Sequence, residues 1–410
     1  MVLSTLLEIN NTPRKAAASS ISTGHKEPIF TYNFIMASLV NFFSASSVTV
    51  LLATLPIYIF KIGARQSEVG LIIGIFAITA MVVRPFSGIA ADIWGRKLIM
   101  VLGSVGMGVS AILYVIATST PPLLGVRILQ GLTFSVTNTA ANALVADIAP
   151  PLRRGEAVGY YGMSNNLAMA SGPALGVLIM ESMDFNGLFL VSAGLGIVSF
   201  VLALFVREPP RQSRPSLIHR PPLIVRAALF PTLIFYSFTI GAGAVVTFLP
   251  LFATEREIGN PGLFFTVQAL VMVAVRSWTG QLSDRFGRAA VAVPGLIIGA
   301  ISIALLSQAS SLTMFLGAAV LYACAFASIQ PALMALVIDR AKTGNRGAAM
   351  GTYMLAMDLG MGSGALIWGL VSDAWGYSRM YLVASLMPLI GIAAFLWVSG
   401  RTRKRARGEH

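Results

Sequence analysis

The chain has 410 residues, of which 56% are hydrophobic and 11% are charged. A soluble domain carries about 25% charged residues, so this chain lacks the charge that covers a globular surface in water. The composition excludes a soluble enzyme, a nucleic-acid-binding domain and a disordered protein. A lipid bilayer is the solvent that suits it.

Long apolar runs follow one another along the sequence. A helix needs about 20 apolar residues to cross a hydrocarbon layer about 30 Å thick. We therefore predict an all-α polytopic membrane protein with twelve transmembrane helices. The twelve runs are 31–60, 67–91, 98–118, 121–147, 155–181, 186–206, 225–253, 261–283, 289–308, 312–339, 347–372 and 379–399.

The runs divide the chain into two halves. We predict an N-terminal half at 29–206 and a C-terminal half at 225–400, each with six helices. A segment rich in proline and arginine at 207–224 separates them and is interpreted as a cytoplasmic linker, because proline interrupts helices. Polar tails at 1–28 and 401–410 complete the chain.

The basic residues predict the orientation. Most of the 29 Lys and Arg residues face the cytoplasm if both termini are placed there; Lys61, Arg65, Arg256 and Arg379 fall on the other side. Because cytoplasmic loops carry an excess of Lys and Arg, we expect a multi-pass protein of the cytoplasmic (inner) membrane. The basic tail 401–410 is then interpreted as an anchor on anionic lipid, and no nucleic acid is expected as a partner.

The second half repeats the first at one constant spacing of 192 residues. Arg84 matches Arg276, and Asn138 matches Gln330. Matches continue through four helices, which chance does not readily produce. Two similar six-helix units related by an axis along the membrane normal are a transporter architecture, because a site between them can open to either side.

Two loops carry a shared motif. The loop at 88–97 reads GIAADIWGRK, and its counterpart at 280–288 reads GQLSDRFGR. Both resemble the signature loop of the major facilitator superfamily, and the resemblance covers residues 29–400. The residues that carry it are Gly88, Asp92, Gly95, Arg96, Lys97, Gly280, Asp284, Gly287 and Arg288.

The resemblance implies a cytoplasmic gate. Asp92 would act on the start of span eleven and Asp284 on the start of span five, where a carboxylate meets the positive end of a helix. Arg346 and Arg154 begin those helices and would join the gate. The alternative is that the basic residues of these loops only fix the orientation. Glycine at 95 is expected to permit a tight turn.

Two further motifs resemble those of proton-coupled drug exporters in the superfamily. Arg127 belongs to an R-x-x-Q-G pattern in span four, where a buried cation is costly unless it faces a cavity or a partner. The alternative is that Arg127 extends to the outer interface. Span five carries a G-P-x-x-G pattern formed by Gly172, Pro173 and Gly176. The pattern departs from the family at Val177, where a second glycine is usual, and helix packing explains it equally well.

Asp358 is the one carboxylate that the sequence places in the middle of a span. Away from water a carboxyl group favours its neutral, protonated form, so this residue can carry a coupling proton. We expect Arg127 to influence that titration. The alternative is a purely structural hydrogen bond. Arg84 and Arg276 are interpreted as cations that extend to the cytoplasmic interface.

Other polar side chains in the spans are candidates for contact with cargo. In the superfamily, helices one, four, seven and ten line the cavity, and Asn138 and Gln330 occupy equivalent places in helices four and ten. Any of these side chains could instead form an interhelical hydrogen bond. The full set is Asn41, Asn138, Asn165, Asn166, Tyr236 and Gln330.

Together these features predict a proton-coupled antiporter that exports small amphipathic compounds or drugs by alternating access, as in efflux and multidrug resistance. The runner-up is proton-coupled uptake of a sugar or metabolite; a membrane sensor or membrane enzyme is more remote. His25, His219 and His410 lie in polar segments, and Cys324 is the single cysteine, so no metal site, cofactor or enzyme activity is expected. The partners are a small-molecule substrate, protons and the bilayer. The family usually functions as a monomer.

Overall fold

The computed structural model describes residues 28–150, 153–208, 225–341 and 346–406. Within these ranges the secondary structure is helical, without strands. The all-α prediction is therefore confirmed. Most of the predicted linker and both chain ends lie outside the described residues.

Among the described residues, the first half contains six helices. The helices of this half are α2 (Tyr32–Thr49), α3 (Leu55–Lys61), α4 (Gln66–Trp94), α5 (Arg96–Ile116), α6 (Thr120–Ile148) and α7 (Arg154–Phe205). The second half follows the same order. Its helices are α8 (Arg226–Glu255), α9 (Gly262–Phe286), α10 (Arg288–Ser307), α11 (Leu312–Arg340), α12 (Arg346–Ala384) and α13 (Leu386–Ala406).

Two of these helices each contain a sharp bend between spans. Helix α7 turns at Asp184, where φ is 65°, and α12 turns at Gly376, where φ is 74°. A positive φ interrupts a right-handed helix. Predicted spans five and six are thus the two arms of α7. Span eleven is the first arm of α12, and span twelve is its second arm continued by α13.

The described residues include seven helices that are long and apolar enough to cross a membrane when α7 and α12–α13 are each counted once. The remaining spans are more polar or interrupted. Helices α2 and α3 are the two pieces of span one, while α6 and α9 carry arginine and amide side chains among their apolar residues. The twelve-helix fold is confirmed once the bends are taken into account.

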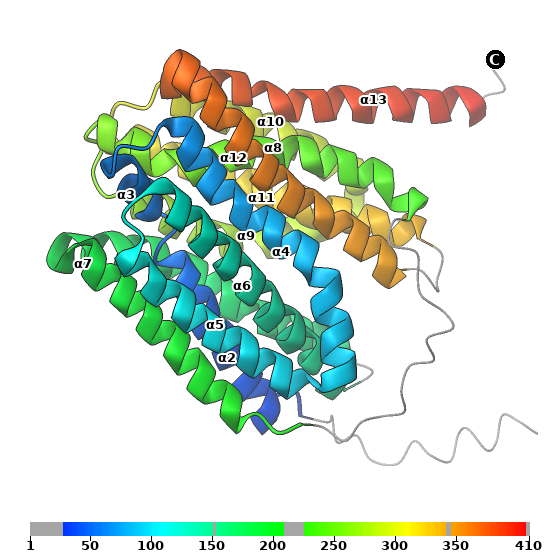
Figure 1. Cartoon of the computed structure of the whole chain (residues 1–410). Coiled ribbons are helices and arrows are strands. Elements are labelled where there is room, and N and C mark those ends of the chain that lie inside the picture. The colour runs from blue at the N-terminus through cyan, green and yellow to red at the C-terminus, as the bar shows by residue number, and fades with distance from the viewer. Residues whose placement is uncertain (1–27, 151–152, 209–224, 342–345, 407–410) are drawn as a thin grey trace, which may run out of the picture.

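The two halves pack against each other through two equivalent helix pairs. Helix α4 packs against α12, and α7 packs against α9; Figure 1 shows α4 (blue) beside α12 (orange). A Cβ on Gly74 of α4 would lie 2.6 Å from the carbonyl oxygen of Gly362 in α12. At the equivalent place Thr266 of α9 donates a hydrogen bond to the carbonyl of Ala170 in α7, at 2.8 Å. The 192-residue repeat is therefore also a repeat of contacts between the halves.

The contacts between the halves are closest on one side of the molecule. We call the ends that carry the loops at 88–97 and 280–288 the signature-loop side, and the other ends the opposite side. On the opposite side, Asp373 of α12 accepts hydrogen bonds from the backbone N–H groups of Gln66 and Ser67 at the start of α4. Towards the signature-loop side, a Cβ added to Gly280 or Gly351 would have no neighbour within 4 Å.

Candidate functional site

An ion pair joins the two halves inside the membrane-spanning region. Arg84 Nη1 of α4 lies 2.9 Å from Asp358 Oδ2 of α12, and the two side chains are 39% and 18% exposed. The contact is an ion pair by distance, without hydrogen-bond geometry at Oδ2. Asp358 lies about 18 Å from the start of α12 at 1.5 Å per residue. Arg84 therefore contacts the other half, whereas the sequence predicts that it extends to the cytoplasmic interface.

A proline next to Arg84 weakens the backbone hydrogen bonding of α4 at this point. Pro85 follows it inside the helix, and a proline removes one backbone hydrogen bond and favours a kink. The equivalent of Pro85 in α9 is Ser277, so the repeat does not require a proline there. The ion pair thus lies beside a weakened turn of the helix that contacts the other half.

Arg127 has a different set of partners. It is 5% exposed, and its guanidinium donates to the carbonyl of Ile72 at 3.2 Å and to Oε1 of Gln130 at 2.8 Å. It also lies over the ring of Phe76, 4.6 Å from the centroid. Tyr114 donates a second hydrogen bond to the same oxygen of Gln130. These contacts link α6 to α4 within the first half and do not bring Arg127 to Asp358.

A chain of amide groups connects three helices of the first half. Asn138 of α6 donates to Oδ1 of Asn41 in α2 at 3.1 Å, and Asn41 donates to the hydroxyl of Ser164 in α7 at 2.7 Å. Asn142 donates to Asn138 from the next turn of α6. Two of the predicted cargo residues are thus brought into contact, while Ser164 and Asn142 were not anticipated.

The remaining predicted cargo residues are dispersed. Tyr236 of α8 shares a hydrogen bond of 3.1 Å with Ser363 of α12. The carbonyl of Gln330 accepts a hydrogen bond from Tyr353 at 2.9 Å, and the Gln330 side chain is half-buried. Asn165 is exposed and Asn166 is half-buried on α7. The structure does not gather these residues into one cluster.

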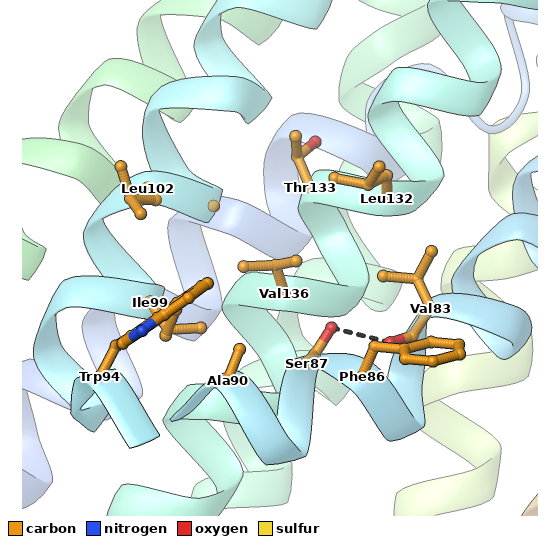
Figure 2. A pocket seen from close by; sticks show the side chains of 11 residues that line it. Val83, Phe86, Ser87, Ala90, Trp94, Ile99, Leu102, Leu132, Thr133 and Val136 are labelled. Atoms are coloured by element: carbon orange, nitrogen blue, oxygen red, sulfur yellow. Dashed lines mark hydrogen bonds between the residues drawn. The ribbon is translucent and has the colours of Figure 1, made fainter. Parts of the chain in front are cut away.

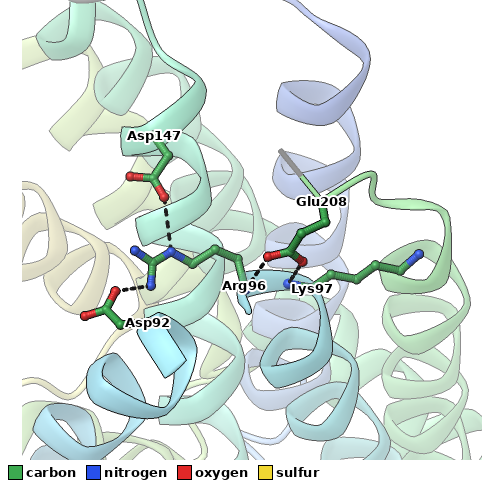
Figure 3. Close-up of polar contacts among 5 residues, drawn as sticks. All are labelled: Asp92, Arg96, Lys97, Asp147 and Glu208. Carbon is green, nitrogen blue, oxygen red and sulfur yellow. Dashed lines mark hydrogen bonds and ion pairs between the residues drawn. The ribbon is translucent and has the colours of Figure 1, made fainter. Parts of the chain in front are cut away.

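The first signature loop forms a compact polar cluster (Figure 3). Gly95 separates α4 from α5 with φ at 103°, a value that glycine adopts readily. Arg96 pairs with Asp92 and donates from Nε to Asp147 of α6 at 3.1 Å. Asp92 therefore contacts a residue of its own half.

Glu208, the second residue of the predicted linker, completes this cluster. Its carboxylate accepts hydrogen bonds of 2.9 Å from the backbone N–H groups of Arg96 and Lys97 (Figure 3). The first N–H groups of a helix lack partners inside the helix, so Glu208 caps α5. This role could not be predicted from the sequence because it depends on how the chain returns after α7.

The second signature loop repeats the first. Gly287 has φ at 92°, and Arg288 donates from Nε to Asp339 of α11 at 3.1 Å, the same distance as in the first loop. The match between Asp147 and Asp339 in the repeat was the available signal for these partners. The side chains of Asp284, Arg154 and Arg346 lie outside the described part of the chain, so their predicted contacts are not seen.

The helix-five motif lies at two interfaces. Gly172 and Gly176 face the end of α2, where an added Cβ would clash with Thr49 and Val50. Pro173, on the same helix, lies against Gly262 at the start of α9 in the other half. The motif thus permits close packing within the first half and between the halves.

A groove on the outside of α4, α5 and α6 is apolar. It measures about 310 Å³ and is lined by side chains such as Val83, Phe86, Trp94 and Leu102 (Figure 2). Phe86, Trp94 and Leu102 are more than half exposed, as expected of side chains that meet lipid. The two hydroxyls in its lining, those of Ser87 and Thr133, each donate to a backbone carbonyl of their own helix. Polar cargo therefore has no partners in this groove.

Two related six-helix units that meet around intramembrane charges define the class of secondary transporters. The sequence model described as Major Facilitator Superfamily matches residues 37–274 and 260–410. The chain belongs to this superfamily, and it is a membrane transporter. Among the part of the chain that the structure describes, no group of His, Cys, Asp and Glu could hold a metal ion.

Similar proteins cover nearly the whole chain. The staphylopine export protein of Staphylococcus aureus is 24% identical over 365 residues, 85% of this chain and 91% of the relative. The multidrug resistance protein MdtG of Escherichia coli is 25% identical over 399 residues, 91% of this chain and 95% of the relative.

Solved structures share the fold. A bacterial homologue of the human lysosomal transporter Spinster, in an inward-facing and unoccupied conformation, superposes with a TM-score of 0.76 at 16% identity. The superposition covers 91% of this chain and 97% of that one. The nucleoside transporter NupG superposes with a TM-score of 0.72 at 15% identity, covering 89% and 99%.

Proposed function

We propose that the protein is a proton-coupled antiporter that exports small amphipathic compounds from the cytoplasm by alternating access. It lies in the cytoplasmic membrane as a monomer, with both termini and the signature-loop side in the cytoplasm. The Arg84–Asp358 ion pair carries this proposal, because it is a titratable bond between the two halves at membrane depth. The multidrug resistance named for MdtG and the export named for the staphylopine export protein favour the outward direction.

The chemistry of the pair suggests how protons and conformation are coupled. When Asp358 is ionised, its attraction to Arg84 holds α12 against α4. A proton on Asp358 removes that attraction and leaves Arg84 without its counter-ion, a costly arrangement in a membrane unless water or cargo reaches it. Protonation therefore favours separation of the halves around the pair, and proton release favours their return.

The other predicted residues take supporting roles in this scheme. Arg127 acts at a distance by fixing α4, the helix that carries Arg84. The amides of Asn41 and Asn138 contact cargo when the halves separate on the signature-loop side, and Asn165, Asn166, Tyr236 and Gln330 are further contacts. The two signature loops stiffen the helix ends that separate when the gate opens.

The test uses everted membrane vesicles with an imposed pH gradient. Adding an exported compound to the medium should collapse the gradient, since the compound enters the vesicle as protons leave. Asp358→Asn should abolish the collapse and leave compound binding to the purified protein measurable. A proton-coupled uptake transporter would not collapse the gradient under these conditions. Unchanged coupling in Asp358→Asn would contradict Asp358 as the proton site.

A further inference from the structure

The two interfaces between the halves differ in charge at equivalent positions. Arg84 of α4 and Arg276 of α9 correspond in the repeat, as do Asp358 of α12 and Asn166 of α7. The α4–α12 interface therefore holds an arginine and a carboxylate. The α7–α9 interface holds an arginine and a neutral amide.

The helices contact each other in the same register at the two interfaces, which supports the comparison of these positions. Gly74 meets the carbonyl of Gly362, and Thr266 meets the carbonyl of Ala170 at the equivalent place. In α4 and α9, the arginine follows the contact residue by ten positions: Arg84 follows Gly74, and Arg276 follows Thr266. In α12 and α7, the polar residue precedes the contact carbonyl by four positions: Asp358 precedes Gly362, and Asn166 precedes Ala170. Since α4 and α9 continue as helices over these residues, Arg276 comes level with Asn166 as Arg84 does with Asp358.

Both arginines lie on a different face of their helix from its most exposed aromatic side chain. Phe86 and Trp278 each follow their arginine by two residues, about 200° around a helix of 3.6 residues per turn. These side chains are 66% and 78% exposed and mark the lipid-facing side of α4 and α9. Arg276 is itself exposed, so packing does not enclose its side chain.

Arg276 has no carboxylate within ion-pair distance among the described side chains. An uncompensated cation in a membrane span is costly and marks a pathway or a ligand. A guanidinium binds a carboxylate through two parallel hydrogen bonds, and the amide of Asn166 can add another donor. At the equivalent position of the other interface, Arg84 contacts a carboxylate, that of Asp358.

We propose that Arg276, with Asn166, binds a carboxylate group of the cargo, so that the exported compounds are amphipathic organic anions. This inference rests on the proposed export function and adds the charge of the cargo to it. The charge of Asp358 does not call for a cationic cargo, because Arg84 already compensates it.

The first experiment measures the electrostatic potential near position 166 and does not require the cargo to be known. Cys324 is the single cysteine, so Asn166→Cys is placed in a Cys324→Ser background. The rates of labelling by an anionic and a cationic methanethiosulfonate reagent of similar size are compared on the purified full chain. Arg276→Gln should lower the anionic-to-cationic rate ratio about threefold or more, because a unit charge at contact distance changes local ion concentrations by such factors.

Two control variants accompany this measurement. Arg276→Lys keeps the charge and should keep the ratio. Arg226→Gln removes an exposed arginine at the start of α8 and should leave the ratio unchanged. An equal ratio with Arg276 and with Gln at 276, or no labelling of position 166 by either reagent, would overturn the proposal.

The second experiment asks which charge the protein binds. Three probes share one ring system: 2-naphthoate, its methyl ester and 2-naphthylmethylamine. The acid should raise the midpoint of thermal unfolding more than the ester or the amine, and Arg276→Gln should remove this rise. Stabilisation by the amine alone, or by the acid equally in Arg276→Gln, would contradict an anion site.

The proposed antiport function and the proposed anionic cargo can be contradicted independently of each other. Loss of proton coupling with an intact anion preference at position 166 contradicts the antiport mechanism only. Intact coupling through Asp358 with no effect of Arg276 on labelling contradicts the anionic cargo only.

Discussion

The carboxylate of Asp373 accepts a hydrogen bond of 2.8 Å from the backbone N–H of Gln66, across the boundary between the two halves. A second bond of 3.0 Å runs from the N–H of Ser67 to the other carboxylate oxygen. One half thus supplies the N-terminal cap of a helix in the other half. This cap holds the opposite side together, where α4 and α12 already pack closely.

The first prediction concerns this cap. Asp373→Ala removes both bonds, and losing a helix cap costs about 0.5–2 kcal/mol. Because that cost falls only on the conformation in which the opposite side is closed, the open conformation should become more populated. A cysteine at Ser67, in the Cys324→Ser background, should then react several-fold faster with a water-soluble thiol reagent applied from the opposite side.

Glu68 provides the matched control for the cap. Its carboxylate accepts a hydrogen bond from the N–H of Arg65 in the same turn, so Glu68→Ala removes a cap of similar kind without a contact between the halves. Labelling at Ser67 should change little. Equal acceleration by Glu68→Ala and Asp373→Ala would show that fraying of α4 explains the result.

The second prediction concerns the close approach of α4 and α12. Gly74→Ala introduces a Cβ 2.6 Å from the carbonyl oxygen of Gly362, and overpacking of this kind costs about 1–3 kcal/mol. The midpoint of thermal unfolding should fall, and transport should weaken. Gly125→Ala is the control, since a Cβ there has no neighbour within 4 Å and alanine favours the helix. A similar loss in both variants would contradict the packing argument.

The third prediction concerns the pH dependence of exchange. Arg84 stabilises the ionised form of Asp358, so Arg84→Gln makes proton release harder and should move the pH profile of transport to higher pH. Arg84→Lys keeps the charge and should keep most of the profile. An unmoved profile in Arg84→Gln would mean that the pair does not control the proton.

The fourth prediction separates Arg127 from this titration. Arg127→Gln removes the hydrogen bond to the carbonyl of Ile72 and the contact with the ring of Phe76. The free energy of unfolding should therefore fall by about 1–3 kcal/mol. The pH profile should move much less than in Arg84→Gln, because Arg127 does not contact Asp358. Equal shifts in the two variants would give Arg127 a direct part in proton coupling.

Much of this protein is determined by its sequence alone. Apolar runs long enough to cross a bilayer, the excess of basic residues in alternate loops and the 192-residue repeat are properties of the linear chain. They predict the twelve spans and the two halves because each span must satisfy its own backbone hydrogen bonds in lipid. The signature loops at 88–97 and 280–288 are likewise local, so their turns could be predicted at Gly95 and Gly287.

Only the tertiary structure decided which polar groups meet. Asp358 pairs with Arg84 and not with Arg127, Asp92 with Arg96 of its own half, and Asp373 with the start of α4. These partners depend on the rotation of each helix about its axis and on its register against a helix from the other half. Hydrophobic periodicity is weak in helices that are apolar on most sides, so the sequence pattern does not specify that rotation.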